Sequence, residues 1–317
     1  MAYSLREALW LVGYGFSDVL LGYPTTDRAA LAELGGDPAA LEAISLMVDH
    51  PRQLEIARDA GAVGARVCVD VDASLRIAGA HLGVRRSPLR DGRDVVRVAS
   101  LARGMGFRPV GLMFYEAQVA GMQDNVRGIG IVKRLSMRRM RRVRLECIRA
   151  LESVTGRPAE IVNSGGSGSV AQSASAPGVT EVASGSGLYV PGLFDHYKSF
   201  APVPSMYFAL SAVRRPAPGI TTLLYGGYPA SGVPGADRLP VLVTPHGGGY
   251  LDTEGAGEVQ TPVSAEIEIG GRAWLRHAKA GEMCERFDSI HLVDEVEGTP
   301  TVVDIVPTYR GEGKCYG

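Results

Sequence analysis

The 317-residue chain has little lysine. Only four of its 33 basic residues are lysines, at Lys133, Lys198, Lys279 and Lys314, and the others are arginines. Because a Schiff base to a carbonyl compound requires a side-chain amine, this scarcity leaves few residues for that chemistry. The 34 acidic residues balance the basic ones and give a net charge of -1. This balance does not indicate a nucleic-acid or strongly acidic partner.

Cysteine and long apolar runs are also scarce. The four cysteines are Cys68, Cys147, Cys284 and Cys315, and no two form a C-x-x-C pair. The sequence therefore shows neither a zinc knuckle nor a dithiol redox motif, and we expect Cys68 and Cys147 to be buried thiols. No apolar run is long enough to cross a membrane, and no signal peptide opens the chain. We expect a soluble cytoplasmic protein with no membrane partner.

Short apolar runs alternate with helical stretches over roughly the first 190 residues, which is typical of a parallel sheet covered by helices. The runs are rich in Val, Ile, Leu and Met, as strands buried on both faces are. We expect strands at 1–3, 19–23, 44–48, 66–71, 109–114, 159–163 and 179–183. Helices are expected at 4–13, 51–60, 93–106 and 129–154.

An arginine cluster lies in the last of these helices. It consists of Arg138, Arg139, Arg141, Arg142 and Arg144. A basic cluster suggests nucleic-acid binding, but no aromatic residues are interleaved with it and the chain has no overall basic excess. We therefore interpret the cluster as the solvated outer face of the helix.

Seven strands are expected, whereas a closed barrel of this class has eight. The first expected strand begins at Met1. We interpret residues 1–198 as a (β/α)8-type TIM barrel that lacks its first βα unit. A miscalled start codon or a truncation would remove such a unit.

Beyond about residue 200 the pattern changes, because Pro and Gly interrupt short alternating runs. We expect residues 199–317 to form a second, antiparallel β domain. Its strands are expected at 206–213, 221–226, 241–244, 264–269, 273–277, 290–293 and 301–305.

Two Gly/Ser-rich segments follow the last two strands of the expected barrel, at 163–169 and 184–189. In barrels of this class, the loops after the last two strands often build a phosphate site with a helix N-terminus. Glycine lets backbone N–H groups close on an anion, and serine hydroxyls add neutral donors. The alternative is a pair of flexible turns.

Several motifs resemble the fold type III pyridoxal-phosphate enzymes, which include D-serine dehydratase and D-threonine aldolase. Within that group the chain resembles a bacterial branch described as amino acid deaminase/aldolase. The motifs are residues 4–8 with 18–24, 70–76 with 81–84, 111–118, 194–197, 254–262, 276–282 and 307–313. In the segment 111–118, Gln118 stands where His is common in the family.

The resemblance implies a pyridoxal 5'-phosphate site at the mouth of the barrel. Arg76 would contact the cofactor ring, although a salt bridge to Asp72 or Asp70 is an equal alternative. Tyr189 would donate to the phosphate. The other residues that the resemblance assigns to the phosphate are Ser164, Gly165, Gly166, Ser167, Gly185, Ser186 and Gly187.

Relatives bind a divalent metal through a His and a Cys or Asp two residues later. Here His277 aligns with that His, but Lys279 occupies the second position. Cys284 or Glu282 would supply the second metal ligand if the following segment turned back toward His277. A pair of ligands made of His277 and Cys284 would suit zinc. The alternative is a buried Cys284 and a His277 that bonds a carbonyl group.

The resemblance implies a lyase that deaminates or cleaves a 3-hydroxy amino acid of D configuration. In this family the Schiff-base lysine lies on the first barrel strand, and no lysine of this chain replaces it, so we expect the chain as printed to be inactive. The alternatives are an amino acid racemase, for which Tyr250 or Tyr309 would be the second acid–base group, a non-catalytic cofactor-binding remnant, and a barrel acting on a phosphorylated metabolite. The resemblance also suggests a homodimer.

Overall fold

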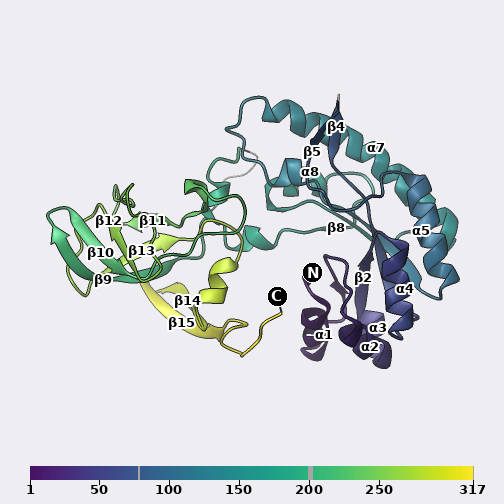
Figure 1. Cartoon of the computed structure of the whole chain (residues 1–317), viewed down its shortest axis with the longest axis horizontal. Coiled ribbons are helices and arrows are strands. Elements are labelled where there is room, and N and C mark those ends of the chain that lie inside the picture. The colour runs from purple at the N-terminus through teal and green to yellow at the C-terminus, as the bar shows by residue number, and fades with distance from the viewer. Residues whose placement is uncertain (78, 199–202, 317) are drawn as a thin grey trace. The chain divides into compact units, whose positions relative to one another are not determined.

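The computed structural model describes residues 1–77, 79–198 and 203–316. They form two compact units, each with its own sheet and core (Figure 1). Unit 1 comprises Met1–Ser184 together with Tyr316 near the chain end, and unit 2 comprises Gly185–Cys315. The two units divide at Ser184, whereas the sequence predicted a boundary after residue 198.

Unit 1 is built on a parallel sheet with the strand order β1-β2-β3-β6-β7-β8. Apart from β4 and β5, which pair outside this sheet, the strands follow the order of the chain, as in a (β/α) barrel. A bridge from Ala2 to Leu21 adds a seventh parallel segment beside β1. The strands are β1 (Val19–Leu20), β2 (Ile44–Val48), β3 (Arg66–Asp70), β6 (Arg108–Phe114), β7 (Ile161–Ser164) and β8 (Glu181–Val182).

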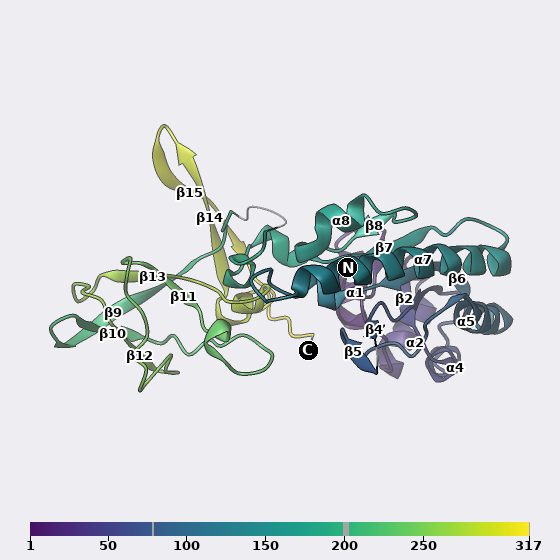
Figure 2. The ribbon, with the colours of Figure 1, turned by 90° about the horizontal axis from the view of Figure 1, so that it is seen from above.

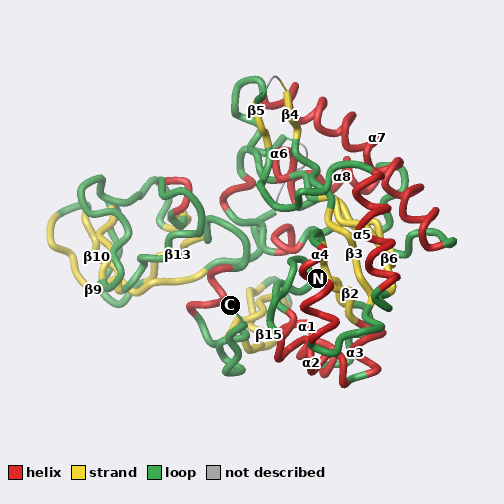
Figure 3. Tube along the Cα trace, turned by 45° about the vertical axis from the view of Figure 1, so that its right-hand side comes forward, coloured by secondary structure: helices red, strands yellow, loops and turns green. Residues whose placement is uncertain are grey.

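Helices flank this sheet (Figure 3), and polar side chains fix where several of them begin. Ser4 caps α1, Asp27 caps α2 and Asp37 caps α3, each accepting a backbone N–H of the first turn. His50 and Gln53 form a capping box on α4. The helices of unit 1 are α1 (Leu5–Gly13), α2 (Arg28–Gly36), α3 (Pro38–Ala43), α4 (Pro51–Asp59), α5 (Gly92–Gly104), α6 (Ala117–Ala120), α7 (Ile129–Thr155) and α8 (Val170–Ala174).

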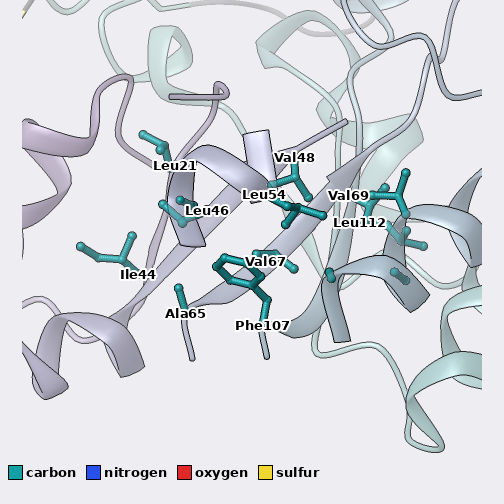
Figure 4. Close-up of a cluster of buried hydrophobic side chains, with 14 of the residues drawn as sticks. Leu21, Ile44, Leu46, Val48, Leu54, Ala65, Val67, Val69, Phe107 and Leu112 are labelled. Carbon is teal, nitrogen blue, oxygen red and sulfur yellow. The ribbon is translucent and has the colours of Figure 1, made fainter. Parts of the chain in front are cut away.

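The core of unit 1 lies between the sheet and its helices (Figure 4). All five residues of β2 are buried, and so are the last six of β6. Aliphatic side chains such as Ile44, Val67 and Leu112 are completely shielded from solvent. Burial on both faces of parallel strands explains why these segments read as continuous apolar runs.

Most of the predicted elements of unit 1 are confirmed, and β2 has the predicted bounds. The expected fold class, a (β/α) barrel-type sheet followed by an antiparallel β domain, is also confirmed. The small hairpin of β4 (Leu75–Ile77) and β5 (Ala80–Leu82) was not predicted.

The interpretation of the arginine cluster is wrong at one residue. Arg144 is completely buried, while Arg138, Arg141 and Arg142 are exposed.

Unit 2 is built on an antiparallel sheet with the order β11-β13-β9-β10-β12. Phe208, Leu210 and Ala212 alternate along β9 and form the core with Leu223 and Leu275. The strand predicted at 264–269 is wrong, because β12 ends at Val263, one residue before it. The strands are β9 (Phe208–Ala217), β10 (Ile220–Leu224), β11 (Val241–Thr244), β12 (Gln260–Val263) and β13 (Arg272–Arg276).

A separate hairpin, β14 (Ser289–Val296) and β15 (Thr299–Pro307), extends away from this five-stranded sheet (Figure 2). Both of its faces are exposed along most of its length. A two-stranded hairpin is marginally stable by itself, and this one leaves apolar side chains such as Val293 and Ile305 exposed.

The parallel sheet of unit 1 should depend on the packing of β6. Leu112 is 0% exposed, so Leu112→Ala removes buried methyl groups and leaves a cavity. We expect a loss of about 2–5 kcal/mol in the free energy of unfolding. Leu135→Ala is the matched control, because Leu135 on α7 is 39% exposed, and it should change stability by less than about 1 kcal/mol. Urea unfolding followed by circular dichroism checks this, and equal losses in the two variants would contradict it.

Candidate functional site

Polar residues gather where the parallel strands of unit 1 end. Asp70 is the last residue of β3, Ser164 is the last of β7, and Tyr115 and Glu116 directly follow β6. Because β3, β6 and β7 pair side by side in parallel, their carboxyl ends lie at one edge of the sheet. This is the edge at which α/β sheets and barrels bind their ligands.

Glu116 organises this edge. Its side chain is completely buried and accepts four hydrogen bonds. Oε2 accepts from the Ser164 hydroxyl at 3.2 Å and from the Gly165 N–H at 3.0 Å. Oε1 accepts from the hydroxyls of Ser169 at 2.9 Å and Ser173 at 2.7 Å. One carboxylate therefore ties the end of β6 to the whole Gly/Ser segment that follows β7.

The buried Arg144 of α7 provides the opposite charge. Its Nη2 donates to the Ser164 hydroxyl at 2.8 Å, and its guanidinium lies 5.6 Å from the centre of the Phe114 ring. Ser164 thus bridges the guanidinium to the Glu116 carboxylate. Burial lowers the pKa of Arg144, and the nearby Glu116 opposes this shift. A charged pair of this kind, bridged by a hydroxyl, leaves neither charge isolated in the interior.

The Gly/Ser turn after β7 needs its glycines. Gly165 has φ +90°, and a Cβ there would lie 2.9 Å from Val182 and 3.0 Å from Ser173. At Gly166 a Cβ would lie 2.9 Å from the Cβ of Ala120. The Gly166 N–H donates to the Ser169 hydroxyl at 3.1 Å. The predicted donors Ser164, Gly165 and Gly166 thus have partners inside the protein, and they shape the turn that leads to the buried Ser167.

A second polar group lies at the same edge. Arg86 places its guanidinium 4.7 Å from the centre of the Tyr115 ring and 5.2 Å from that of Tyr23. Burial raises the pKa of Tyr115, which Arg86 opposes. Burial also raises the pKa of Asp70 to about 7, with the neighbouring Asp49 contributing in the same direction. Asp70 can therefore gain or lose a proton near neutral pH.

Arg76, which was predicted either to contact the cofactor or to pair with an acidic residue, forms an ion pair with Asp72. Its Nη2 lies 3.1 Å from Oδ2 of Asp72, four residues earlier. Arg76 belongs to β4, in the hairpin that was not predicted, and its side chain is 36% exposed. This arrangement matches the alternative of an ordinary ion pair with Asp72.

The second predicted phosphate segment belongs to unit 2. Gly185, Ser186, Gly187 and Leu188 form a short 3-10 helix. Tyr189, which follows it, packs edge-on against His277 with ring centroids 6.4 Å apart. Burial raises the pKa of Tyr189, and Cys284 contributes to the shift. The structure therefore places Tyr189 in the neighbourhood of the predicted metal ligands.

The predicted metal ligands do not assemble a complete donor set. His277 is 2% exposed, and its ring nitrogens are shielded from solvent. Burial lowers the pKa of His277, and backbone groups of Ala280 and Met206 oppose this shift. Cys284 is half-buried, and burial raises the pKa of its thiol. Within residues 1–77, 79–198 and 203–316, no three His, Cys, Asp or Glu side chains come together as a metal site. The donor set around His277 therefore does not complete a zinc site.

The four lysines are divided between the two units. In the described part of unit 1 the only lysine is Lys133 on α7, which donates to Asp124 at 2.6 Å and to the Met122 carbonyl at 2.7 Å. Lys198, Lys279 and Lys314 belong to unit 2. None of these residues follows a strand of the parallel sheet.

Solved structures share this architecture. The D-threonine aldolase from Filomicrobium marinum matches with a TM-score of 0.79 and 20% identity, over 98% of this chain and 80% of the aldolase. The D-threo-3-hydroxyaspartate dehydratase from Delftia sp. HT23 matches with a TM-score of 0.71 and 16% identity, over 96% of this chain and 82% of that chain. The chain has the fold of the fold type III pyridoxal-phosphate enzymes. An alanine racemase-like protein from Idiomarina loihiensis shares the fold type III architecture at a TM-score of 0.67 and 12% identity, over 96% of this chain and 82% of that chain.

The sequence comparisons add nothing to this result, because no protein-family model and no curated protein match the chain. The resemblance seen in the sequence is thus confirmed at the level of the fold. Tested against the described residues, pyridoxal phosphate fits in part. The Gly/Ser turn lies at the edge of the sheet where barrels of this class bind a phosphate, although the Gly165 N–H and the Ser169 hydroxyl already donate to Glu116. For the aldehyde of the cofactor, the described part of unit 1 offers only Lys133, which is bonded to Asp124.

Glu116 should be a main determinant of the stability of unit 1. Glu116→Ala would leave the buried Arg144 without its countercharge, and we expect a loss of about 3–5 kcal/mol in the free energy of unfolding. Glu116→Gln keeps an acceptor oxygen and should lose less. Urea unfolding measures both values. A Glu116→Ala protein as stable as the wild type would show that the network does not stabilise the fold.

Asp70 should make stability depend on pH. Its pKa is about 7 in the folded chain and near 3.8 when unfolded, so the folded state binds more protons between these values. Stability should fall as pH rises through that window, by on the order of 1 kcal/mol per pH unit at its steepest. Asp70→Asn should remove this fall. The measurement is the free energy of unfolding of both proteins from pH 4 to pH 8, and parallel profiles would argue against it.

Proposed function

We propose that this chain binds pyridoxal 5'-phosphate and belongs functionally with the lyases that act on 3-hydroxy amino acids of D configuration. The observation that carries the proposal is the Gly/Ser turn fixed by Glu116 at the carboxyl edge of a fold type III sheet. Two structural neighbours with this fold are a D-threonine aldolase and a D-threo-3-hydroxyaspartate dehydratase. Both names describe enzymes of D-3-hydroxy amino acids.

The residues of the chain have distinct roles in this proposal. Glu116 and Arg144 fix the turn that we assign to the cofactor phosphate, so that the turn needs no reorganisation when it binds. The second predicted phosphate segment, Gly185, Ser186 and Gly187 with Tyr189, belongs to unit 2, and the proposal does not depend on it. We assign Arg76 to its ion pair with Asp72 and give it no contact with the cofactor ring.

Bound pyridoxal phosphate supplies an electron sink for bonds at the α-carbon of an amino acid. The chain contributes Asp70, whose pKa of about 7 lets its carboxyl group hold or release a proton at neutral pH. Arg86 lies between the rings of Tyr23 and Tyr115 and keeps a positive charge at this edge. These groups provide acid–base chemistry and a countercharge for an anionic substrate.

A specific observation favours a second candidate, a protein that binds the cofactor without catalysis. Lys133 is committed to Asp124 and Met122, so unit 1 presents no uncommitted lysine amine among its described residues.

The racemase alternative gains no support from Tyr250. Its hydroxyl donates to the Pro240 carbonyl at 2.8 Å, and burial raises its pKa far above the usual value.

Cofactor binding and Schiff-base formation are separable in one experiment. The purified chain is mixed with pyridoxal phosphate, its absorbance is recorded, and borohydride is added before peptide mapping. We expect cofactor that co-elutes with the protein but no reduced adduct on Lys133. Absence of any bound cofactor would contradict the proposed function. A stoichiometric adduct on Lys133 or Lys279 would contradict the non-catalytic candidate.

We also propose that two copies of the chain associate through the β14–β15 hairpin. The hairpin exposes Leu292, Val293, Val296, Val302, Val303 and Ile305 beside the acidic Asp294, Glu295, Glu297 and Asp304, and it carries no Lys or Arg. Helix α7 exposes apolar and basic side chains that match the apolar and acidic side chains of the hairpin. Ile131, Leu135, Arg138, Arg142 and Arg149 are exposed at i, i+4, i+7, i+11 and i+18, on one face. Both apolar side chains and charges of opposite sign therefore match between the two surfaces.

A charge exchange tests this association. Glu295→Lys/Glu297→Lys places positive charge on the hairpin, and Arg138→Glu/Arg142→Glu places negative charge on α7. Each variant alone should be monomeric by sedimentation, because like charges would then face each other in a dimer. An equimolar mixture should restore dimers, since both contacts are again complementary. A wild-type monomer, or a mixture that stays monomeric, would refute the association.

A further inference from the structure

A cavity of about 690 Å³ in unit 2 involves other residues than the proposed cofactor site does. Its walls come from the start of β9, from β13, from the 3-10 helix Glu282–Arg286 and from both strands of the β14–β15 hairpin. All of these segments belong to unit 2, so the cavity is formed by one compact part of the chain. Cavities of this size bind small molecules, mostly through apolar walls that carry a few polar groups.

Two exposed aromatic side chains flank a small residue on one wall of the cavity. Trp274 of β13 lies directly opposite Ala209 of β9 in the antiparallel register, and Tyr207 precedes Ala209 by two residues. All three line the cavity. Trp274 is 47% exposed and Tyr207 is 42% exposed, so both rings keep apolar surface in contact with water. Because the Ala209 side chain is only a methyl group, it leaves room beside the two rings for the planar ring of a ligand.

The β14–β15 hairpin supplies a second apolar wall. Val293 and Val302 pair across its two strands, and both line the cavity together with Ile290. Phe287 adds a further apolar side chain. A ligand that covers these side chains removes apolar surface from water, which is favourable. Val293 and Val302 also belong to the hairpin surface that we propose to contact a second copy, so association has to be measured beside ligand binding.

The charge that the cavity offers to a ligand is positive. Arg272 of β13 is exposed, and in the part of the chain that the structure describes no carboxylate lies within ion-pair distance of its guanidinium. His291 of β14 adds an imidazole to the wall. The acidic residue of the wall, Asp288, is already paired, because its Oδ1 lies 3.0 Å from Nε of Arg310. A guanidinium without a counterion favours an anionic ligand, and its planar fork matches a carboxylate.

We propose that this cavity binds an aromatic carboxylate of one or two rings. The ring packs on Tyr207 and Trp274 over Ala209, and the carboxylate pairs with the Arg272 guanidinium. Arg272 precedes Trp274 by two residues on β13, and both are exposed, so the two side chains lie on one face of the strand. A saturated acid leaves the stacking surface unused, and an uncharged ring leaves Arg272 unpaired. The proposal is independent of pyridoxal phosphate, because the cavity uses residues of unit 2 alone.

Calorimetric titration with three related compounds tests the class of ligand. We expect 2-naphthoate to bind at one site per chain. The alcohol 2-naphthalenemethanol has the same rings without the charge and should bind about tenfold more weakly or worse. Decahydro-2-naphthoate keeps the charge but is saturated and non-planar, and it should bind about threefold more weakly or worse. Absence of 2-naphthoate binding, or equal affinities for the three compounds, would overturn the proposal.

Two substitutions test the position of the ligand. Arg272→Gln should weaken 2-naphthoate binding about tenfold or more and leave the binding of 2-naphthalenemethanol unchanged. Ala209→Ile fills the space beside Trp274 and should abolish binding of both compounds. Arg214→Gln is the matched control, because Arg214 is an exposed arginine of β9 that does not line the cavity, and it should bind like the wild type. An Arg272→Gln or Ala209→Ile protein that melts and binds like the wild type would refute the assignment.

Cys284 lines the cavity and reports its occupation directly. Bound 2-naphthoate should slow the alkylation of Cys284 by iodoacetamide, measured by peptide mapping, and should not change that of the exposed Cys315. Unchanged alkylation of Cys284 in the presence of bound ligand would show that the ligand lies elsewhere. Alkylation that slows as the chain is concentrated without ligand, with dimers seen by sedimentation, would show that a second copy covers the cavity. Either result would contradict the proposal.

Discussion

The Glu116 carboxylate is the interaction on which unit 1 depends at its ligand-binding edge. It lies two residues after β6, whose last six residues are buried, and joins that strand to the turn after β7 through four hydrogen bonds. A carboxylate in such a position is stable only because every lone pair has a donor and because Arg144 supplies the opposite charge through Ser164. The turn is thereby held in one conformation, and a preorganised turn binds an anion at a smaller entropic cost than a mobile one.

Unit 2 uses the same principle with different residues. The Ser231 hydroxyl links the Glu282 carboxylate to the Lys279 ammonium, much as the Ser164 hydroxyl links Glu116 to Arg144. The difference is exposure. The Glu116 carboxylate is completely buried, whereas the Lys279 side chain is partly exposed and lines a cavity of unit 2. The first arrangement fixes the turn after β7, and the second fixes the Lys279 side chain beside Ser231.

The sequence predicted the elements whose signals are local. The continuous apolar run of β2 and the proline and polar cap that begin α4 lie where the patterns indicated. The Gly/Ser turn was also found, because glycine and serine after a buried strand are a compositional signal. The pairing of Arg76 with Asp72 was anticipated only as one of two alternatives, since four-residue spacing suits an ion pair as well as a free arginine.

Features that depend on long-range contacts were missed. Glu116 is an ordinary acidic residue after a strand until β7 and α7 bring Ser164 and Arg144 to it, 48 residues away in the case of Ser164. Arg144 looked like part of a solvated cluster, because helical periodicity separates faces but does not show which face is buried. The strand predicted at 264–269 failed for a related reason, since pairing with β10 fixes β12 at Gln260–Val263 instead.

The central claim is that the Glu116-held turn recognises a phosphate. The most direct measurement is equilibrium dialysis of the chain against pyridoxal 5'-phosphate and, separately, against pyridoxal, which has the same ring and aldehyde but no phosphate. The account predicts that the phosphorylated compound is retained and the unphosphorylated one is not. Equal retention of the two compounds would contradict it.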